Sequence, residues 1–192
     1  DGVGARRSCL RSANLSGRRR ISFSIDVVAR EAFPGALAFG PIPRGVEDVQ
    51  AIADWGASLI VSVLPLTDME RRDAADLPHW ISAQGIPWLH LPIIDYQTPD
   101  AAFEALWKTH GPKILDVLKD GGNVFVHCAA GLGRSGTVVA RILIDSGIPI
   151  EDAIIAARAA RPGAIETEGQ EAYLMKSNKK NIAYCQLIKD KN

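Results

Sequence analysis

Residues 123–136 read NVFVHCAAGLGRSG, and the change of pattern within them decides the predicted fold. They begin with a short apolar run that contains two valines, which is typical of a strand buried on both faces. A glycine-rich turn follows, and residues 135–145 then place apolar side chains at helical spacing. This stretch therefore predicts a strand, a tight loop and a helix in immediate succession.

Strands and helices alternate along the chain on both sides of this stretch. Further strands are expected at residues 36–41, 59–64 and 88–94. Helices are expected at residues 46–55, 68–75, 78–84, 101–119 after a cap at Asp100, 150–160, and from 168 to 176 or beyond. Such alternation predicts an α/β fold: a single domain with a mostly parallel central sheet, flanked by helices on both faces, and a helical C-terminal portion. Ligands of such sheets bind beyond the carboxyl ends of the strands, where the glycine-rich loop lies.

The glycine-rich loop carries groups suited to binding a tetrahedral oxyanion. Cys128 ends the predicted strand, Arg134 lies near the start of the predicted helix, and the backbone N–H groups between them can converge on one point. These amides belong to Ala129, Ala130, Gly131, Leu132 and Gly133. Arg134 adds a planar guanidinium that can bind two phosphate oxygens at once. A phosphate group is therefore expected to bind to these amides and to Arg134.

Cys128 has the position of a nucleophile in this loop. A helix N-terminus and a neighbouring guanidinium favour the thiolate form of a cysteine, and a thiolate beneath a bound phosphate is placed for in-line attack on phosphorus. Ser135 can donate a hydrogen bond to the sulfur and assist its departure from a thiophosphate. His127 is expected to face away from substrate, with its ring bonded to the backbone to fix the loop. A nucleotide-binding loop of the G-x-x-x-x-G-K-[ST] type is excluded, because the sequence here lacks that order and its lysine.

Three segments together resemble the cysteine-dependent protein tyrosine phosphatase superfamily and, within it, the dual-specificity group. They are HCAAGLGRS at residues 127–135, HLPIIDYQTPD at residues 90–100, and RPGAIET at residues 161–167 with Gln170 after it. The likeness covers about residues 35–176 and is greatest to the kinase-associated phosphatases, which act on a phosphothreonine of cyclin-dependent kinases. It implies a phosphatase-type phosphate loop between strand and helix and a cysteinyl-phosphate intermediate.

The resemblance also assigns roles to two residues outside the loop. Asp95 is expected to be the general acid that protonates the leaving group and later activates water, the alternative being that it caps a turn. Asp100 is a nearby rival that suits a helix N-cap better, and Asp68 is a weaker candidate whose setting also fits a capping box. Gln170 corresponds to the family glutamine that orients the hydrolytic water, whereas its residue type alone predicts a solvent-exposed helix position.

The 192 residues carry 22 basic and 22 acidic side chains, so the net charge is zero. Residues 1–20 have a net charge of +5 and residues 176–192 of +4, which leaves −9 for residues 21–175. An acidic centre argues against a nucleic-acid partner, although the basic ends could recruit an acidic one. No apolar run reaches the roughly 18 residues of a membrane span.

The charge distribution suggests three parts to the chain. We expect a basic N-terminal extension at residues 1–30, either disordered or foreign to the natural chain, a phosphatase domain at residues 31–178, and a lysine-rich tail at residues 179–192. Cys9, Cys128 and Cys185 lie far apart and fit neither a disulfide framework nor a paired metal site. Sparse cysteines favour a reducing setting, so a cytoplasmic location is expected.

The substrate is expected to be a phosphorylated protein or peptide, and no metal or cofactor is expected. The variable loop positions Ala129, Ala130 and Leu132 carry no charge, whereas related lipid phosphatases place lysines there. This favours monoesters of phosphotyrosine and/or phosphoserine or phosphothreonine. Two alternatives stay open: a phosphatase of phosphoinositides or other small phosphate esters, and a weakly active module that binds phosphorylated groups. His79 and His110 have no partners at the spacing of metal ligands.

Overall fold

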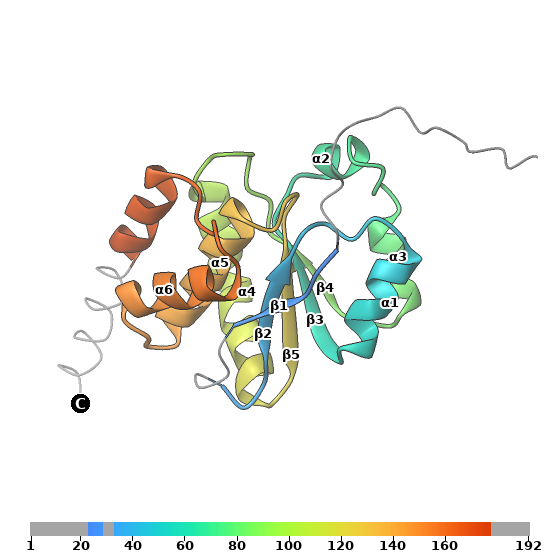
Figure 1. Cartoon of the computed structure of the whole chain (residues 1–192), viewed down its shortest axis with the longest axis horizontal. Helices are drawn as coiled ribbons and strands as arrows, with labels where there is room; N and C mark the ends of the chain where they lie inside the picture. Colours follow the sequence, from blue (N-terminus) through green and yellow to red (C-terminus); the bar gives the residue numbers. More distant parts are fainter. Residues whose placement is uncertain (1–22, 29–32, 178–192) are drawn as a thin grey trace, which may run out of the picture.

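The computed structural model describes residues 23–28 and 33–177 of the chain. Its centre is a five-stranded sheet with the strand order β1-β2-β5-β3-β4 (Figure 1). The strands are β1 (Asp26–Val27), β2 (Leu37–Gly40), β3 (Ala57–Ser62), β4 (Trp88–His90) and β5 (Asn123–His127). Four of them pair in parallel, and β1 pairs antiparallel with β2 at the edge of the sheet. The mostly parallel sheet predicted from the sequence is therefore confirmed.

Helices cover both faces of this sheet, as predicted. They are α1 (Val46–Asp54), α2 (Leu66–Glu70), α3 (Leu77–Ala83), α4 (Ala101–Lys119), α5 (Gly133–Asp145) and α6 (Ile150–Ala160), and residues 168–177 are also helical. Figure 1 shows α1 and α3 on one side of the sheet and α4, α5 and α6 on the other. Among the described residues, no helix is long and apolar enough to cross a membrane.

Successive side chains of the central strands enter two different hydrophobic cores, because side chains alternate between the two faces of a sheet. The core beneath α1, α2 and α3 contains the register-matched set Ala38, Ile60 and Phe125. The core beneath α4, α5 and α6 contains the next residue of each strand, Phe39, Val61 and Val126. All six side chains are fully buried, which explains why these strands read as continuous apolar runs.

Two elements end several residues earlier than predicted, whereas the other boundaries differ from the prediction by two residues at most. The strand expected at residues 88–94 is assigned only over β4, which ends at His90, although the N–H groups of Leu91 and Ile93 still donate to the carbonyls of Ser62 and Val63 at 2.9 and 3.2 Å. The helix expected at residues 68–75 is the shorter α2, which begins directly after Pro65.

The sequence does not predict β1, which lies inside the segment 1–30 assigned to an N-terminal extension. Its backbone pairs with β2 through Asp26 and Phe39 and through Val27 and Ala38. The domain bounds 31–178 stay a prediction. Residues 1–22 and 178–192, which hold most of the two basic ends, lie outside the described residues.

Candidate active site

Four loops meet at one edge of the sheet, because the parallel strands β2, β5, β3 and β4 all point their carboxyl ends there. Arg44 follows β2, Asp68 follows β3, Asp95 follows β4 and Cys128 follows β5. A cavity of about 240 Å³ opens between these loops. It is lined by Arg44, Arg72, Asp95, Tyr96, Cys128, Ala129, Ala130, Arg134 and Glu166.

The loop after β5 curls back around the Cys128 sulfur. The N–H of Gly131 donates to Sγ at 3.2 Å, and the Ser135 hydroxyl oxygen lies 3.3 Å from Sγ. The Gly131 N–H thus points its hydrogen at the sulfur, and the Ser135 hydroxyl lies within reach to do the same. Gly131 has a φ of +76°, and a Cβ there would come within 2.3 Å of the Gly40 carbonyl carbon, so the curl excludes a side chain at this position.

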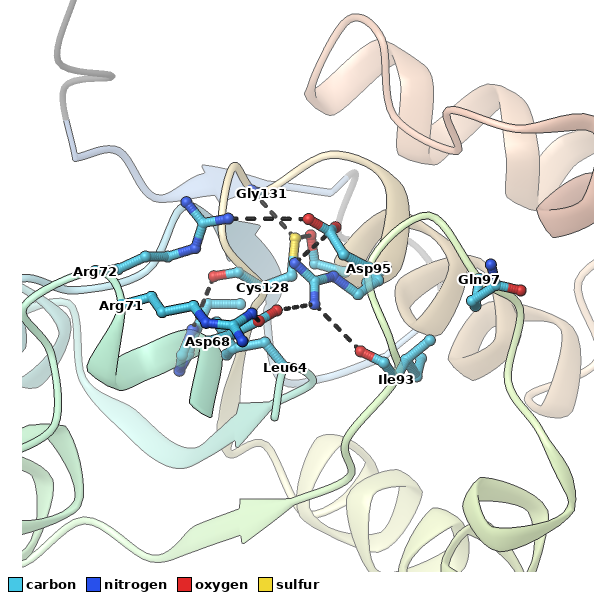
Figure 2. Close-up of polar contacts among 12 residues, drawn as sticks. Leu64, Asp68, Arg71, Arg72, Ile93, Asp95, Gln97, Cys128 and Gly131 are labelled. Atoms are coloured by element: carbon cyan, nitrogen blue, oxygen red, sulfur yellow. Dashed lines mark hydrogen bonds and ion pairs between the residues drawn. The ribbon is translucent and has the colours of Figure 1, made fainter. Parts of the chain in front are cut away.

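The guanidinium of Arg134 is 2% exposed and has three acceptors. Its Nη1 donates to Asp68 Oδ2 at 2.9 Å and to the Ile93 carbonyl oxygen at 3.2 Å, and its Nη2 lies 2.9 Å from Asp95 Oδ1. Figure 2 shows Cys128 between Asp68 and Asp95. The arrangement pairs a buried cation in the wall of the cavity with two carboxylates, which bond to the N–H donors at the edge of its plane.

Sequence reasoning missed the contact between Asp68 and Arg134. Asp68 lies in the first turn of α2, whereas the N-cap position belongs to Pro65, and no side chain caps the helix. The interpretation of Asp68 as part of a capping box is therefore wrong. Its carboxylate instead fixes the orientation of the Arg134 guanidinium.

Of the candidate acids, Asp95 lies at the cavity and Asp100 does not line it. The Asp95 side chain is 46% exposed, and its second oxygen lies 3.9 Å from Arg72 Nη2. Asp100 accepts the N–H of Phe103 at 2.9 Å as the N-cap of α4, as its position in the sequence predicts. Asp95 is thus the carboxylate available to a group bound on Arg134.

His127 is fully buried behind the loop, in a chain of hydrogen bonds. The Cys128 carbonyl, 3.3 Å from Nδ1, can only accept, so Nδ1 carries the proton and Nε2 accepts from the Ser62 hydroxyl at 2.6 Å. The indole N–H of Trp88 donates to the same hydroxyl oxygen at 2.8 Å. Burial lowers the pKa of His127 to about 4, which keeps the ring neutral. The ring contacts the backbone of Cys128, and its role in fixing the loop stays a prediction.

Gln170 is buried, at 1% exposure, and not solvent-exposed as its residue type suggests. Its Oε1 accepts the N–H groups of Glu166 at 2.9 Å and Thr167 at 3.3 Å, and its Nε2 lies 3.5 Å from the Gln97 carbonyl oxygen. The carboxylate of Glu166 in turn accepts the N–H of Gly133 at 2.8 Å. Gln170 therefore holds the backbone of a segment that contacts the loop between β5 and α5.

Arg161 supports the same loop from the other side. Its Nη2 donates to the Ala130 carbonyl at 3.0 Å, while Nη1 bonds to Ser24 at 2.8 Å and to Asp26. The residue thus joins β1 to the loop between β5 and α5. Arg161 belongs to the segment 161–167 that resembles the family, but the sequence predicts no role for it. Nothing in the local pattern indicates the distant carbonyl that it contacts.

No group of three or more His, Cys, Asp or Glu side chains that could hold a metal ion occurs within residues 23–28 and 33–177. The groups that converge on the cavity include the sulfur of Cys128, three arginines and the carboxylates of Asp95 and Glu166. With backbone amides and a helix N-terminus beside them, these groups can bind a phosphate ester and attack its phosphorus.

Comparisons with known proteins agree with this chemistry. Residues 28–174 match the family described as "PTP-SAK: Swiss Army Knife protein, DSP-PTPase phosphatase domain", and the chain belongs to this family. The dual-specificity resemblance predicted from three sequence segments is therefore confirmed.

Individual relatives are similar over most of the domain. Protein tyrosine phosphatase type IVA 3 of Bos taurus is 34% identical over 134 residues, which are 67% of this chain and 68% of that protein. Cyclin-dependent kinase inhibitor 3 of Rattus norvegicus is 29% identical over 157 residues, 80% of this chain and 72% of that protein. The chain spans only 10% of another relative, Protein tyrosine phosphatase domain-containing protein 1 of Danio rerio.

A solved structure of kinase associated phosphatase has the same fold. It superposes with a TM-score of 0.74 at 24% sequence identity, and the match covers 84% of this chain and 97% of that one. That structure carries a substitution of its catalytic site cysteine by serine. At this identity the comparison shows the fold, and the roles of individual residues here depend on the geometry above.

Proposed function

We propose that this chain is a phosphoprotein phosphatase that hydrolyses phosphotyrosine and/or phosphoserine or phosphothreonine monoesters. The observation that supports the proposal is the convergence of Cys128, Arg134 and Asp95 on one cavity from two different loops and the start of a helix. A phosphate bound to Arg134 Nη2 would take the position that Asp95 Oδ1 occupies at 2.9 Å. Asp95 would then turn toward the leaving group, where a general acid is needed.

In the first step of the proposed reaction, the Cys128 thiolate attacks phosphorus and the bond from phosphorus to the ester oxygen breaks. Asp95 donates its proton to the departing oxygen, so that an alcohol or phenol leaves. Arg134 and the loop amides bind the non-bridging oxygens, where negative charge is greatest. The amides are those of Ala129, Ala130, Gly131, Leu132 and Gly133.

In the second step, water attacks the cysteinyl-phosphate and gives its proton to Asp95. The bond between sulfur and phosphorus breaks, inorganic phosphate leaves, and the thiolate is regenerated. Ser135, 3.3 Å from Sγ, would donate to the sulfur as its charge returns. Gln170 would orient the water, either by turning its amide from its present backbone partners or by fixing the segment 166–170 around the water.

A second candidate substrate class is suggested by two arginines outside the loop. Arg44 and Arg72 line the same cavity as Cys128, although the loop itself carries no further cation. A substrate with a second anionic group, such as a phosphoinositide, would find a partner in them. Rates on phosphotyrosine, phosphothreonine and inositol phosphate substrates, measured side by side, decide between the two classes.

The test of the function is hydrolysis of an aryl phosphate under reducing conditions. We expect wild type to turn over and Cys128→Ser to be inactive, because the hydroxyl is a far weaker nucleophile. Asp95→Asn is expected to lower kcat by about a hundredfold or more, the usual contribution of a general acid. Asp100→Asn is the matched control, since Asp100 caps α4, and its kcat is expected to stay within about twofold of wild type.

Each contrary outcome refutes a defined part of the proposal. A wild-type protein that binds phosphate but does not hydrolyse the ester would be a phospho-binding module. A Cys128→Ser variant with full activity would remove Cys128 from the mechanism. Equal losses in Asp95→Asn and Asp100→Asn would refute the assignment of Asp95 as the acid.

A further inference from the structure

A carboxylate of the chain itself is bonded to the phosphate loop. Oε2 of Glu166 accepts the N–H of Gly133 at 2.8 Å, and Gly133 is the first residue of α5. The Glu166 side chain also lines the cavity that contains Cys128 and Arg134. The contact is close: a Cβ on Gly133 would lie 2.5 Å from Oε2. Glu166 therefore bonds to one of the amides expected to bind phosphate.

The backbone around Glu166 is fixed from several directions. Its own N–H donates to the buried Gln170 side chain at 2.9 Å. The preceding Ile165 donates its N–H to the Leu132 carbonyl at 3.3 Å, and Arg158 donates to the Ile165 carbonyl at 3.2 Å. Ile165 has a φ of +62°, a conformation that a β-branched residue adopts only when its surroundings impose it. The position of the carboxylate against the loop is therefore built into the fold.

We propose that Glu166 is an affinity-determining residue of the site: an internal anion that competes with substrate and product phosphate for the Gly133 N–H. The proposal rests on the proposed function of the loop as a phosphate site. A carboxylate and a phosphate dianion repel each other at the distance of a shared donor, so phosphate binds fully only when Glu166 withdraws. This exchange weakens the binding of inorganic phosphate and so speeds its release after hydrolysis.

Replacement of the charge alone isolates this effect. Glu166→Gln keeps an oxygen that can accept the Gly133 N–H, but hydrogen bonds to charged groups are stronger than neutral ones and the repulsion is removed. Glu168→Gln is the matched control, because it removes the same charge from an exposed position two residues further on. Both variants therefore have the same net charge and differ in the contact with the loop.

The measurement is the dissociation constant of inorganic phosphate by calorimetry, together with the constant for product inhibition of aryl phosphate hydrolysis. Glu166→Gln is expected to bind inorganic phosphate about fivefold more tightly than wild type, and Glu168→Gln to stay within about twofold. KM is expected to fall with affinity while kcat does not rise in proportion. If Glu166 only stabilised the start of α5, its replacement would lower the melting temperature and would not tighten phosphate binding.

The outcomes separate this proposal from the proposed function. Equal or weaker phosphate binding in Glu166→Gln than in Glu168→Gln overturns the role of Glu166 and leaves the phosphatase proposal intact. Tighter binding in Glu166→Gln without turnover by any variant supports the role of Glu166 and refutes the enzyme. Absence of phosphate binding in all three proteins overturns both.

Discussion

Mild acid is expected to destabilise the fold through His127. Burial lowers the pKa of this residue to about 4 from 6.5, although the hydrogen bond to the Cys128 carbonyl partly opposes the change. Between these two values the unfolded chain binds a proton that the folded chain does not, so the stability is fully present above pH 6.5 and is lost as the pH falls toward 4. The total is about 3 kcal/mol, at about 1.4 kcal/mol for each pH unit between the two pKa values.

The loss has a defined course within this window. The same linkage gives a decrease in the free energy of unfolding of about 1.4 kcal/mol at pH 5.5 and about 2.5 kcal/mol at pH 4.5, relative to neutral pH. Structurally, a proton on Nε2 turns this atom from an acceptor into a donor. The 2.6 Å bond from the Ser62 hydroxyl must then reverse, although this oxygen already accepts from Trp88.

Urea unfolding at several values between pH 7.5 and 4.5 measures the effect. His127→Asn is the control, because its amide can still donate to the Cys128 carbonyl but does not titrate. Wild type is expected to lose about 2.5 kcal/mol more than this variant over the interval, since the carboxylates titrate in both proteins. Parallel profiles would refute the reasoning. NMR of the wild-type protein gives a second test that does not depend on whether the variant folds. A His127 ring resonance that titrates near pH 6.5 would also refute the reasoning.

Two further substitutions test how the loop is held. Asp68→Asn is expected to lower kcat/KM about tenfold, because Arg134 loses a charged acceptor. The control Arg71→Ala removes a largely exposed arginine 3.7 Å from Asp68 and is expected to change kcat/KM less than about twofold, so equal losses would contradict the role of Asp68. Gly131→Ala is expected to lower the free energy of unfolding by more than about 2 kcal/mol, because its Cβ meets backbone at 2.3 Å. Gly85 is the control, because it has a similar φ of +68° and an added Cβ there would have no neighbour within 4 Å. Gly85→Ala is expected to lower the free energy of unfolding by about 1 kcal/mol. Equal losses for the two variants in urea unfolding would count against the crowding at Gly131.

The parts of the fold that the sequence predicted are those with local signals. The apolar run of β5 and the glycine-rich loop after it define a strand, a turn and a helix within one short stretch, and Asp100 is recognisable as a cap from its neighbours. These features depend on backbone conformation and on periodicity, which neighbouring residues determine. For the same reason the alternation of strands and helices predicted the parallel sheet.

The contacts that complete the site had no such signal. Asp68 is 66 positions from Arg134, and Glu166 is 33 positions from Gly133, so each pairing exists only after the strands have brought their carboxyl ends together. Gln170 illustrates the point in part: its Oε1 accepts the N–H of Glu166 only four positions away, whereas its Nε2 lies 3.5 Å from the Gln97 carbonyl oxygen, 73 positions away. The likeness to a family singled out Gln170, whereas Asp68 and Glu166 required the three-dimensional arrangement.

The distribution of carboxylates around the loop explains how an acidic domain can contain a phosphate site. Arg134 is buried, and an unpaired buried cation is costly, so Asp68 and Asp95 share its charge. Asp68 bonds to Nη1 of Arg134, on the side toward α2. Asp95 bonds to Nη2 of Arg134 and Glu166 to the Gly133 N–H, which are donors that a bound phosphate would need. In the proposed reaction, phosphate therefore replaces carboxylates already present, and its net affinity is moderate. The same exchange releases Asp95 at the moment when the leaving group requires a proton, so binding energy is converted into the arrangement that the transition state needs.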